Sequence, residues 1–81
     1  MEVTIREEAI KDLEKIPSPQ NEAIKRKMAT LENYPEVTGL KRLFNFDFSH
    51  RLRMWNYRIL IDIEPEKIIV ARVKTRKNAY A

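Results

Sequence analysis

The sequence predicts an α+β domain in which a helical hairpin packs on one face of an antiparallel β-meander, in the order β-α-α-β-β-β. Apolar residues recur at helical spacing from residue 6 to about residue 34, and at alternate positions from residue 50 onward. The 81 residues are expected to form one domain, 1–81, that buries roughly 60% of its unfolded surface. This length leaves no room for a second core.

The N-terminal third predicts a short strand and two helices. Residues 3–5 (VTI) are flanked by charges, so this strand is expected to join the later sheet. Apolar residues at helical spacing mark a first helix over 6–16, which Pro17 ends. Ser18 and Pro19 suit the N-cap and the first position of a second helix that runs to about Tyr34.

The segment 40–49 (LKRLFNFDFS) is compatible with either an edge strand or a loop, because its aromatic residues alternate. These residues are Phe44, Phe46 and Phe48. We expect their rings to plug the end of the core, in preference to stacking on nucleic acid bases.

The stretch 50–80 predicts three consecutive strands, because apolar and basic residues alternate along it. A two-residue turn at Trp55 and Asn56, with a positive φ at Asn56, would set Arg53 opposite Arg58. Two like charges then face each other across a strand pair, which destabilises a sheet. Such a cluster is expected to have a function.

Two registers are possible at the second turn of this meander. Pairing Glu64 with Ile68 leaves residues 65–67 as the loop, whereas pairing Ile63 with Ile68 pushes Arg72 onto the dry face. We prefer the first register. Its apolar face carries Leu52, Ile59, Ile61, Ile63, Ile69, Ala71 and Val73. Its basic face carries Arg51, Arg53, Arg58, Arg72, Lys74 and Arg76.

The basic charge of the chain belongs to its second half. Residues 1–36 hold 6 Lys/Arg and 8 Asp/Glu, a net charge of −2, while residues 37–81 hold 10 and 4, a net charge of +6. Such asymmetry indicates a polyanionic partner, above all nucleic acid, or an acidic protein that covers the patch. A solvated basic face explains the charge alone equally well.

Composition excludes several classes of site. Cysteine is absent and His50 is the single histidine, so no disulfide framework, metal site or cofactor is expected. No phosphate-binding P-loop, GxGxxG or HExxH motif occurs. The absence of long apolar runs and of a signal-peptide pattern predicts a cytoplasmic protein with no membrane partner.

The arginine-rich face suits the cleavage of RNA without a metal ion. This reaction activates the ribose 2′-hydroxyl, stabilises a phosphorane that gains negative charge, and protonates the departing 5′-oxygen. Arginines supply bidentate phosphate contacts and charge stabilisation. Tyrosine or histidine transfers protons, although His50 is equally consistent with an ordinary surface histidine.

Two motifs resemble those of the RelE/ParE superfamily of toxin–antitoxin toxins. The pattern R-x-R-hydrophobic-x-x-Y-R matches Arg51, Arg53, Tyr57 and Arg58. The pattern R-V-x-x-R-x-x-x-Y matches Arg72, Val73, Arg76 and Tyr80. The order of elements and the helix-ending Pro17 also agree, so the resemblance covers essentially the full length.

The resemblance implies a ribosome-dependent mRNA endonuclease of the RelE branch, an mRNA interferase that inhibits translation and is neutralised by a cognate antitoxin. Its catalytic residues would be Arg51, Arg53, Arg58, Arg76 and Tyr80. Further contacts to RNA phosphates are expected from His50, Arg72, Lys74 and Lys77. The partners implied are mRNA in the ribosomal A site and the antitoxin, with which a monomeric free toxin would form a hetero-oligomer.

The general base and the branch of the superfamily stay open at this point. Some RelE-type enzymes carry lysine where this chain has Arg51 and Arg53, and arginine is a poor proton acceptor. His50 or the ribosome itself would then take the proton. The alternatives are a ParE-like non-enzymatic gyrase inhibitor, a branch that usually lacks the tyrosine matched by Tyr80, and an inactive paralogue that only binds its antitoxin.

Overall fold

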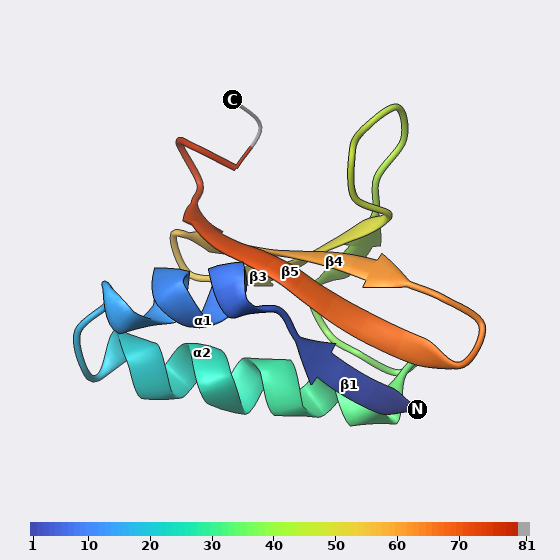
Figure 1. The fold of residues 1–81 in the computed structure, drawn as a ribbon, viewed down its shortest axis with the longest axis horizontal. Helices are drawn as coiled ribbons and strands as arrows, with labels where there is room; N and C mark the ends of the chain where they lie inside the picture. The colour runs from blue at the N-terminus through green and yellow to red at the C-terminus, as the bar shows by residue number, and fades with distance from the viewer. Residues whose placement is uncertain (80–81) are drawn as a thin grey trace.

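The computed structural model describes residues 1–79 and shows two helices beneath a five-stranded sheet (Figure 1). The strands are β1 (Glu2–Ile5), β2 (Leu40–Arg42), β3 (His50–Met54), β4 (Tyr57–Ile63) and β5 (Lys67–Thr75). The helices are α1 (Glu7–Glu14), α2 (Gln20–Ala29) and the 3-10 helix η1 (Thr30–Asn33). The predicted α+β class is confirmed, and β2 is a strand beyond the predicted order.

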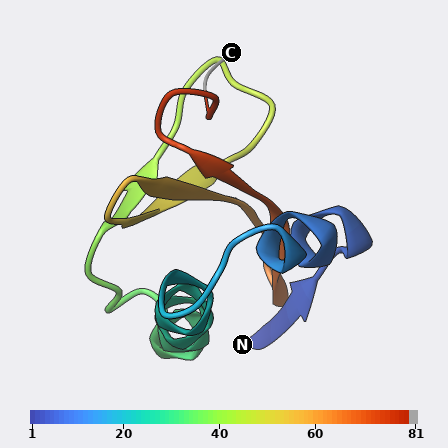
Figure 2. The ribbon, with the colours of Figure 1, turned by 90° about the vertical axis from the view of Figure 1, so that its left-hand side faces the viewer.

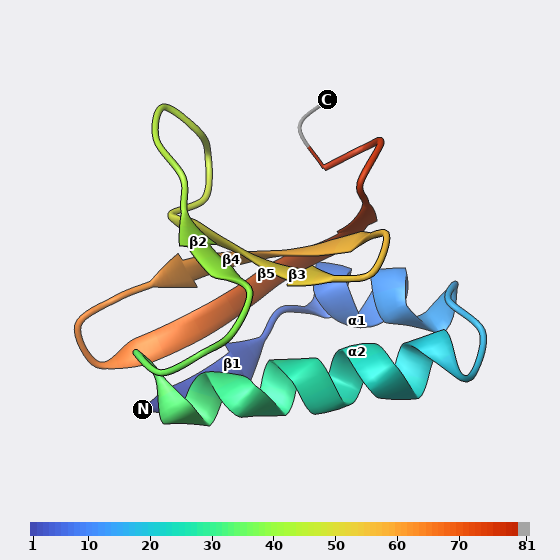
Figure 3. The same cartoon turned by 180° about the vertical axis from the view of Figure 1, so that it is seen from behind.

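The sheet has the strand order β1-β5-β4-β3-β2. Strands β3 to β5 form the expected antiparallel meander, and β2 adds an antiparallel strand to its edge. Strand β1 pairs in parallel with β5, from Glu2 opposite Lys67 to Ile5 opposite Val70. The helices connect the two edges of the sheet, because the chain leaves β1 at one edge and enters β2 at the other. Figure 3 shows this return beneath the sheet from behind.

The helices are shorter than predicted, and the second one has a different cap. Ser18 is not the N-cap of α2, because its hydroxyl donates to Glu22 Oε1 at 2.8 Å instead of accepting a backbone N–H. Pro19 occupies that position without a side-chain cap. Asn21 Nδ2 donates to the carbonyl oxygen of Leu13 at 2.7 Å, which ties α2 to the end of α1.

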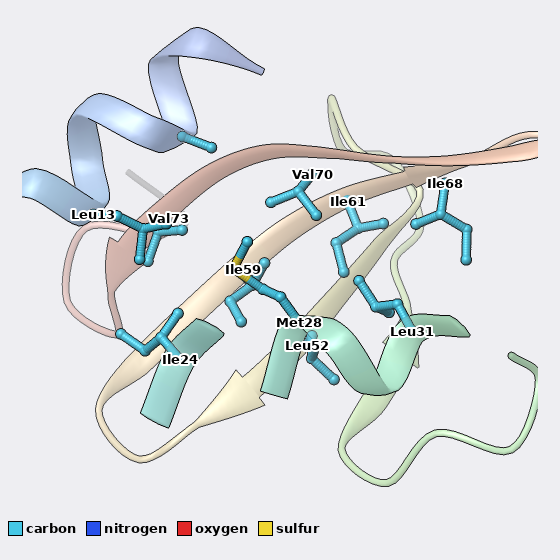
Figure 4. Close-up of a cluster of buried hydrophobic side chains, with 11 residues drawn as sticks. Leu13, Ile24, Met28, Leu31, Leu52, Ile59, Ile61, Ile68, Val70 and Val73 are labelled. Carbon is cyan, nitrogen blue, oxygen red and sulfur yellow. The ribbon is translucent and has the colours of Figure 1, made fainter. Parts of the chain in front are cut away.

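The core lies between the helices and the sheet (Figure 4). Its cluster consists of Ala9, Leu13, Ile24, Met28, Leu31, Leu52, Ile59, Ile61, Ile68, Val70 and Val73. Each large side chain buried here stabilises the fold by about 1.5–3 kcal/mol. Tyr57 packs against the same cluster, as its position in β4 predicts.

The β4–β5 pair combines both of the registers considered for it. The pairing from Tyr57 opposite Thr75 to Leu60 opposite Arg72 follows the preferred register, and the pairing of Ile63 with Ile68 follows the rejected one. A β-bulge at Leu60/Ile61 joins the two halves and gives β5 one extra residue.

The bulge corrects the predicted apolar face, because one extra residue reverses the alternation of side chains. Ile68 and Val70 belong to the core cluster, where Ile69 and Ala71 were expected. The pairing of Leu60 with Arg72 keeps Arg72 away from the core face. The bulge therefore allows apolar residues of β5 to enter the core while Arg72 stays out of it.

The β3–β4 turn has the predicted register, with Arg53 opposite Arg58. The positive φ of this turn falls on Trp55, at 52°, and not on Asn56, so the predicted position was wrong. A positive φ at the first central residue matches the twist of the flanking strands. The Trp55 side chain is consequently presented outward, with 56% of the residue exposed.

Residues 43–49 form a loop that rises from the sheet on the side away from the helices (Figures 1 and 3). The predicted aromatic plug of the core is wrong, because β2 ends at Arg42 and the loop carries the rings away from the helices. Phe44 is 76% exposed and Phe46 is 36% exposed, whereas Phe48 is half-buried.

Gly39 determines how β2 begins beside β3. Its φ is +87°, and its carbonyl oxygen accepts the Arg53 N–H and the Arg51 guanidinium, each at 3.1 Å. A Cβ at this position would lie 3.3 Å from the Arg53 carbonyl oxygen. Glycine therefore permits both the backbone conformation and the close approach.

We predict that Gly39→Ala lowers the free energy of unfolding by about 1–2 kcal/mol, because an L-residue is strained at this φ. Urea denaturation followed by circular dichroism measures the change. Thr38→Ala, at the exposed neighbouring position, is the control and should shift stability by less than about 0.5 kcal/mol. Equal stabilities of the two variants would contradict the strain assigned to Gly39.

Candidate functional site

Basic side chains gather on the face of the sheet that the helices leave open. Alternation along β3 places Arg51 and Arg53 opposite in direction to Leu52, which is in the core. Arg53 pairs with Arg58, and Arg58 pairs with Lys74, so three cations lie side by side across β3, β4 and β5. The structure thus brings together the strand arginines that the sequence predicts as a site.

Lys41 is a member of this face that the sequence-based prediction missed. It pairs with Arg51, and its neighbour Leu40 packs against the core, so the Lys41 side chain points away from the helices. The signal was the apolar–basic step from Leu40 to Lys41, which repeats the pattern of β3. The direction of the Lys41 side chain could not be predicted from this signal, because the segment 40–49 was compatible with either a strand or a loop.

Arg58 is the most unusual residue of the site. Only 7% of it is exposed, and its Nη1 donates to the carbonyl oxygens of Trp55 and Tyr57 at 3.2 and 3.1 Å. Within residues 1–79 no carboxylate forms an ion pair with it. A buried guanidinium that is oriented but not neutralised favours an anionic ligand, because burial weakens the competition from water.

Arg72 lies at the border of this face and is held by α1. Its Nε and Nη2 donate to the two carboxylate oxygens of Asp12 at 2.8 and 3.1 Å. Asp12 Oδ2 also accepts the Val73 N–H at 3.0 Å. Figure 2 shows α1 beside β5. The helix follows β1 in the chain and lies against the part of β5 that β1 does not pair with. Arg72 therefore stabilises the fold, and its predicted contact with RNA stays a prediction.

The Asp12 carboxylate is held in its charged form. Burial by itself raises the pKa of Asp12, but the hydrogen bonds from Arg72 and Val73 and the charges of Arg72 and Lys74 outweigh it. The pKa of Asp12 consequently lies below its ordinary value of 3.8. The same hydrogen bond raises the pKa of Arg72.

The C-terminal turn brings Arg76 and Lys77 to the end of the β3–β4 hairpin. The Arg76 N–H donates to the Asn56 carbonyl oxygen at 2.5 Å, which ties the turn to the hairpin. An open hollow of about 770 Å³ lies here, lined in part by Trp55, Arg76 and Lys77. Tyr80, predicted as part of this site, lies outside the described residues.

His50 is not brought together with the arginines. It occupies the same side of β3 as Leu52, opposite in direction to Arg51 and Arg53. Its Nδ1 lies 2.8 Å from the hydroxyl of Ser49. Burial and, to a smaller extent, the charge of Arg42 lower the pKa of His50 below its ordinary value of 6.5.

The described part of the chain contains no cluster of three or more His, Cys, Asp or Glu side chains arranged to hold a metal ion. It also contains no helix long and apolar enough to span a membrane.

Comparison with known proteins identifies the family. Residues 3–80 match the family described as the ParE toxin of type II toxin–antitoxin system, parDE. The chain belongs to this family. It is a toxin of the RelE/ParE superfamily, related to RelE, which confirms the resemblance of its motifs.

Relatives named RelE resemble this toxin over nearly its whole length. Toxin RelE3 of Methanocaldococcus jannaschii is 30% identical over 84 aligned positions, which cover 99% of this chain and 96% of the relative. A chain of the RelB–RelE antitoxin–toxin complex from Methanococcus jannaschii superposes with a TM-score of 0.77 at 26% identity, covering 95% and 94% of the two chains. The toxin–antitoxin complex RelBE2 from Mycobacterium tuberculosis gives 0.77 at 25% identity, covering 93% and 96%.

We predict that Asp12→Ala lowers the free energy of unfolding by about 1–2 kcal/mol at pH 7, because it removes a bidentate ion pair that is partly screened by solvent. The wild-type protein should lose this contribution on acidification. Since the folded-state pKa is depressed, the contribution is complete above about pH 4–5 and disappears as the pH falls through the folded-state pKa.

Denaturation curves of wild type and Asp12→Ala between neutral and acidic pH measure this effect. The two stabilities should converge as the pH falls. Glu7→Ala removes an exposed ion pair to Lys11 on the same helix and should leave the pH dependence nearly unchanged. A constant difference between wild type and Asp12→Ala at every pH would contradict the role of the Asp12 charge.

Proposed function

We propose that this toxin is a ribosome-dependent endoribonuclease, which cleaves mRNA by attack of a ribose 2′-hydroxyl and thereby inhibits translation. Arg58 carries the proposal, because it is a buried guanidinium without a carboxylate partner among the described residues, beside two further cations. A phosphate group is the ligand that such a site accommodates best.

In this mechanism the 2′-hydroxyl gives up its proton and its oxygen attacks the adjacent phosphorus. The bond to the 5′-oxygen breaks, that oxygen takes up a proton to become a 5′-hydroxyl, and a 2′,3′-cyclic phosphate is left. Arg58 and Arg76 stabilise the negative charge that gathers on the phosphorane oxygens. Arg51 and Arg53 bind the neighbouring phosphates, and Tyr80 orients the nucleotide. The reaction as proposed uses neither a metal ion nor a cofactor.

We assign these arginines to charge stabilisation and not to proton transfer, because a guanidinium holds its proton at every physiological pH. His50 points to the other side of β3 from the arginines, so its ring is poorly placed to take the 2′-proton. We therefore propose that a group of the ribosome accepts the proton of the 2′-hydroxyl.

The proposed partners follow from the same surface. An antitoxin with acidic side chains would neutralise the toxin by covering the basic face. The similarity to a toxin solved as a RelB–RelE antitoxin–toxin complex supports an antitoxin as the partner. We propose that the free toxin is a cytoplasmic monomer that forms a hetero-oligomer with this antitoxin and otherwise acts on mRNA in the ribosomal A site.

A second candidate function is ParE-like inhibition of DNA gyrase without catalysis, which the description of the matching family favours. Two assays separate the candidates. A ribosome-dependent nuclease cuts mRNA in a cell-free translation reaction and leaves gyrase active, whereas a gyrase inhibitor blocks supercoiling and spares mRNA. A protein inactive in both assays that still binds an acidic antitoxin would be a binding module only.

We predict that Arg58→Ala reduces the rate of mRNA cleavage on ribosomes by about 100-fold or more, because one preformed contact to the phosphorane is lost. Primer extension on mRNA from a cell-free translation reaction measures cleavage. Arg26→Ala removes an exposed cation from α2 and should cleave like wild type. Since Arg58 is buried, circular dichroism must show that the variant is folded, and wild-type activity in a folded Arg58→Ala would refute its role.

We predict a loss of similar size for Arg76→Ala in the same assay, without loss of stability, because the Arg76 side chain is exposed. The matched control is Lys67→Ala, an exposed cation at the opposite end of β5. Equal activities of Arg76→Ala and Lys67→Ala would mean that Arg76 contributes only to net charge.

A further inference from the structure

The loop 43–49 projects from the sheet beside the basic face. Leu43 N–H donates to the Ser49 carbonyl oxygen at 2.8 Å, which closes the loop at its base. Figures 1 and 3 show that the loop and residues 76–79 rise on the same side of the sheet, from opposite ends. A ligand on the basic face would therefore lie between two projections.

The aromatic rings of this loop are presented to solvent at a cost in hydrophobic free energy. Phe44 and Phe46 are the exposed rings, and Phe46 also contacts Phe48 with 6.2 Å between ring centroids. The Arg42 guanidinium lies 5.4 Å from the centroid of the Phe44 ring. Rings and a guanidinium held in this way offer flat surfaces on which other planar groups stack.

The composition of the loop favours nucleic acid bases over a protein as the stacking partner. The polar residues Asn45 and Asp47 separate the rings in sequence. The loop therefore lacks the continuous run of apolar residues that is typical of the centre of a protein–protein interface. Cations flank it instead, with Lys41 opposite Arg51 at its base on the open face. Separate aromatic rings beside a positively charged track are the features that bind single-stranded nucleic acid.

The loop is also at a suitable distance from the proposed cleavage site. The end of the loop at His50 pairs with Ile61, which is three residues from Arg58 along β4. At about 3.3 Å per residue, these positions are about 10 Å apart. About three stacked nucleotides, at about 3.4 Å each, would span this separation. The aromatic rings lie beyond the base of the loop, so the bases that reach them would be at least three nucleotides from the phosphate at Arg58.

We propose that the loop 43–49 is a base-stacking platform for single-stranded RNA. Bases at least three nucleotides from the cleaved phosphate stack on Phe44 and Phe46, while Lys41 and Arg51 bind the phosphates between them. The proposal rests on the ribonuclease function and adds to it a site that binds bases without reading their sequence, since every base has a face that stacks.

The test compares two probes that differ only in their bases. Fluorescence anisotropy measures the affinity of the toxin for a labelled single-stranded RNA of about 10 nucleotides and for an abasic oligomer with the same ribose-phosphate backbone. Wild type should bind the intact RNA about 10-fold or more tightly than the abasic oligomer. The double variant Phe44→Ala/Phe46→Ala should bind both probes equally, with an unchanged salt dependence.

Matched variants separate stacking from general apolar contact. Tryptophan at both positions should preserve the preference for intact RNA, whereas leucine should abolish it, because leucine has no π face. Ile10→Ala removes an exposed apolar side chain from α1 and should behave like wild type. Circular dichroism confirms folding of each variant, which is expected because the replaced side chains are exposed.

Three results would overturn the proposal: equal binding of intact and abasic probes by wild type, an unchanged preference in the double alanine variant, or full preference with leucine. An unchanged preference in the double alanine variant would place the contact with bases elsewhere and make a protein partner the next occupant of the loop to test. Full preference with leucine would mean that the loop makes general apolar contact with bases instead of stacking on them. A wild type that prefers intact RNA but cuts no mRNA on ribosomes refutes only the proposed function. A wild type that cuts mRNA without this preference refutes only the stacking platform.

Discussion

The ion pair between Asp12 and Arg72 joins the two halves of the chain across 60 residues of sequence. Its carboxylate accepts three hydrogen bonds, two from the guanidinium and one from the Val73 N–H. Val73 lies in the part of β5 that does not pair with β1. The Asp12 side chain therefore accepts a backbone hydrogen bond at an edge of β5 that no strand covers. The contact anchors α1 and completes the sheet on which the basic face is built.

The same ion pair distinguishes a cation that stabilises the fold from those that are available to bind a ligand. Arg72 is neutralised by Asp12 and serves the fold, whereas Arg58 has no carboxylate partner within residues 1–79 and is oriented by two backbone carbonyls. Arg58 lies between Arg53 and Lys74, an arrangement that costs stability because like charges repel across strands. Violations of this kind are expected at functional sites, where a ligand supplies the missing countercharge.

Much of the fold and of the candidate site follows from the order of residues alone. Alternation in β3 and the Trp55–Asn56 turn predict that Arg53 faces Arg58, because a two-residue turn leaves a single register. The register of β4 and β5 was less predictable, because each of the two registers holds for only one half of the strand pair. A bulge between Leu60 and Ile61 joins the two halves. Phe44 and Phe46 were misplaced because their alternation is compatible with burial or exposure, and only the path of the loop separates these outcomes.

By itself, the sequence determined the class of the fold, the side of each strand on which the arginines lie, and the superfamily motifs. These properties are local, because they depend on spacings of a few residues and on short turns. Only the tertiary structure decided that Asp12 neutralises Arg72, that Arg58 is buried without a carboxylate partner among the described residues, and that the aromatic loop stands beside the basic face. These properties depend on contacts between distant segments, which form only when helices and sheet pack together.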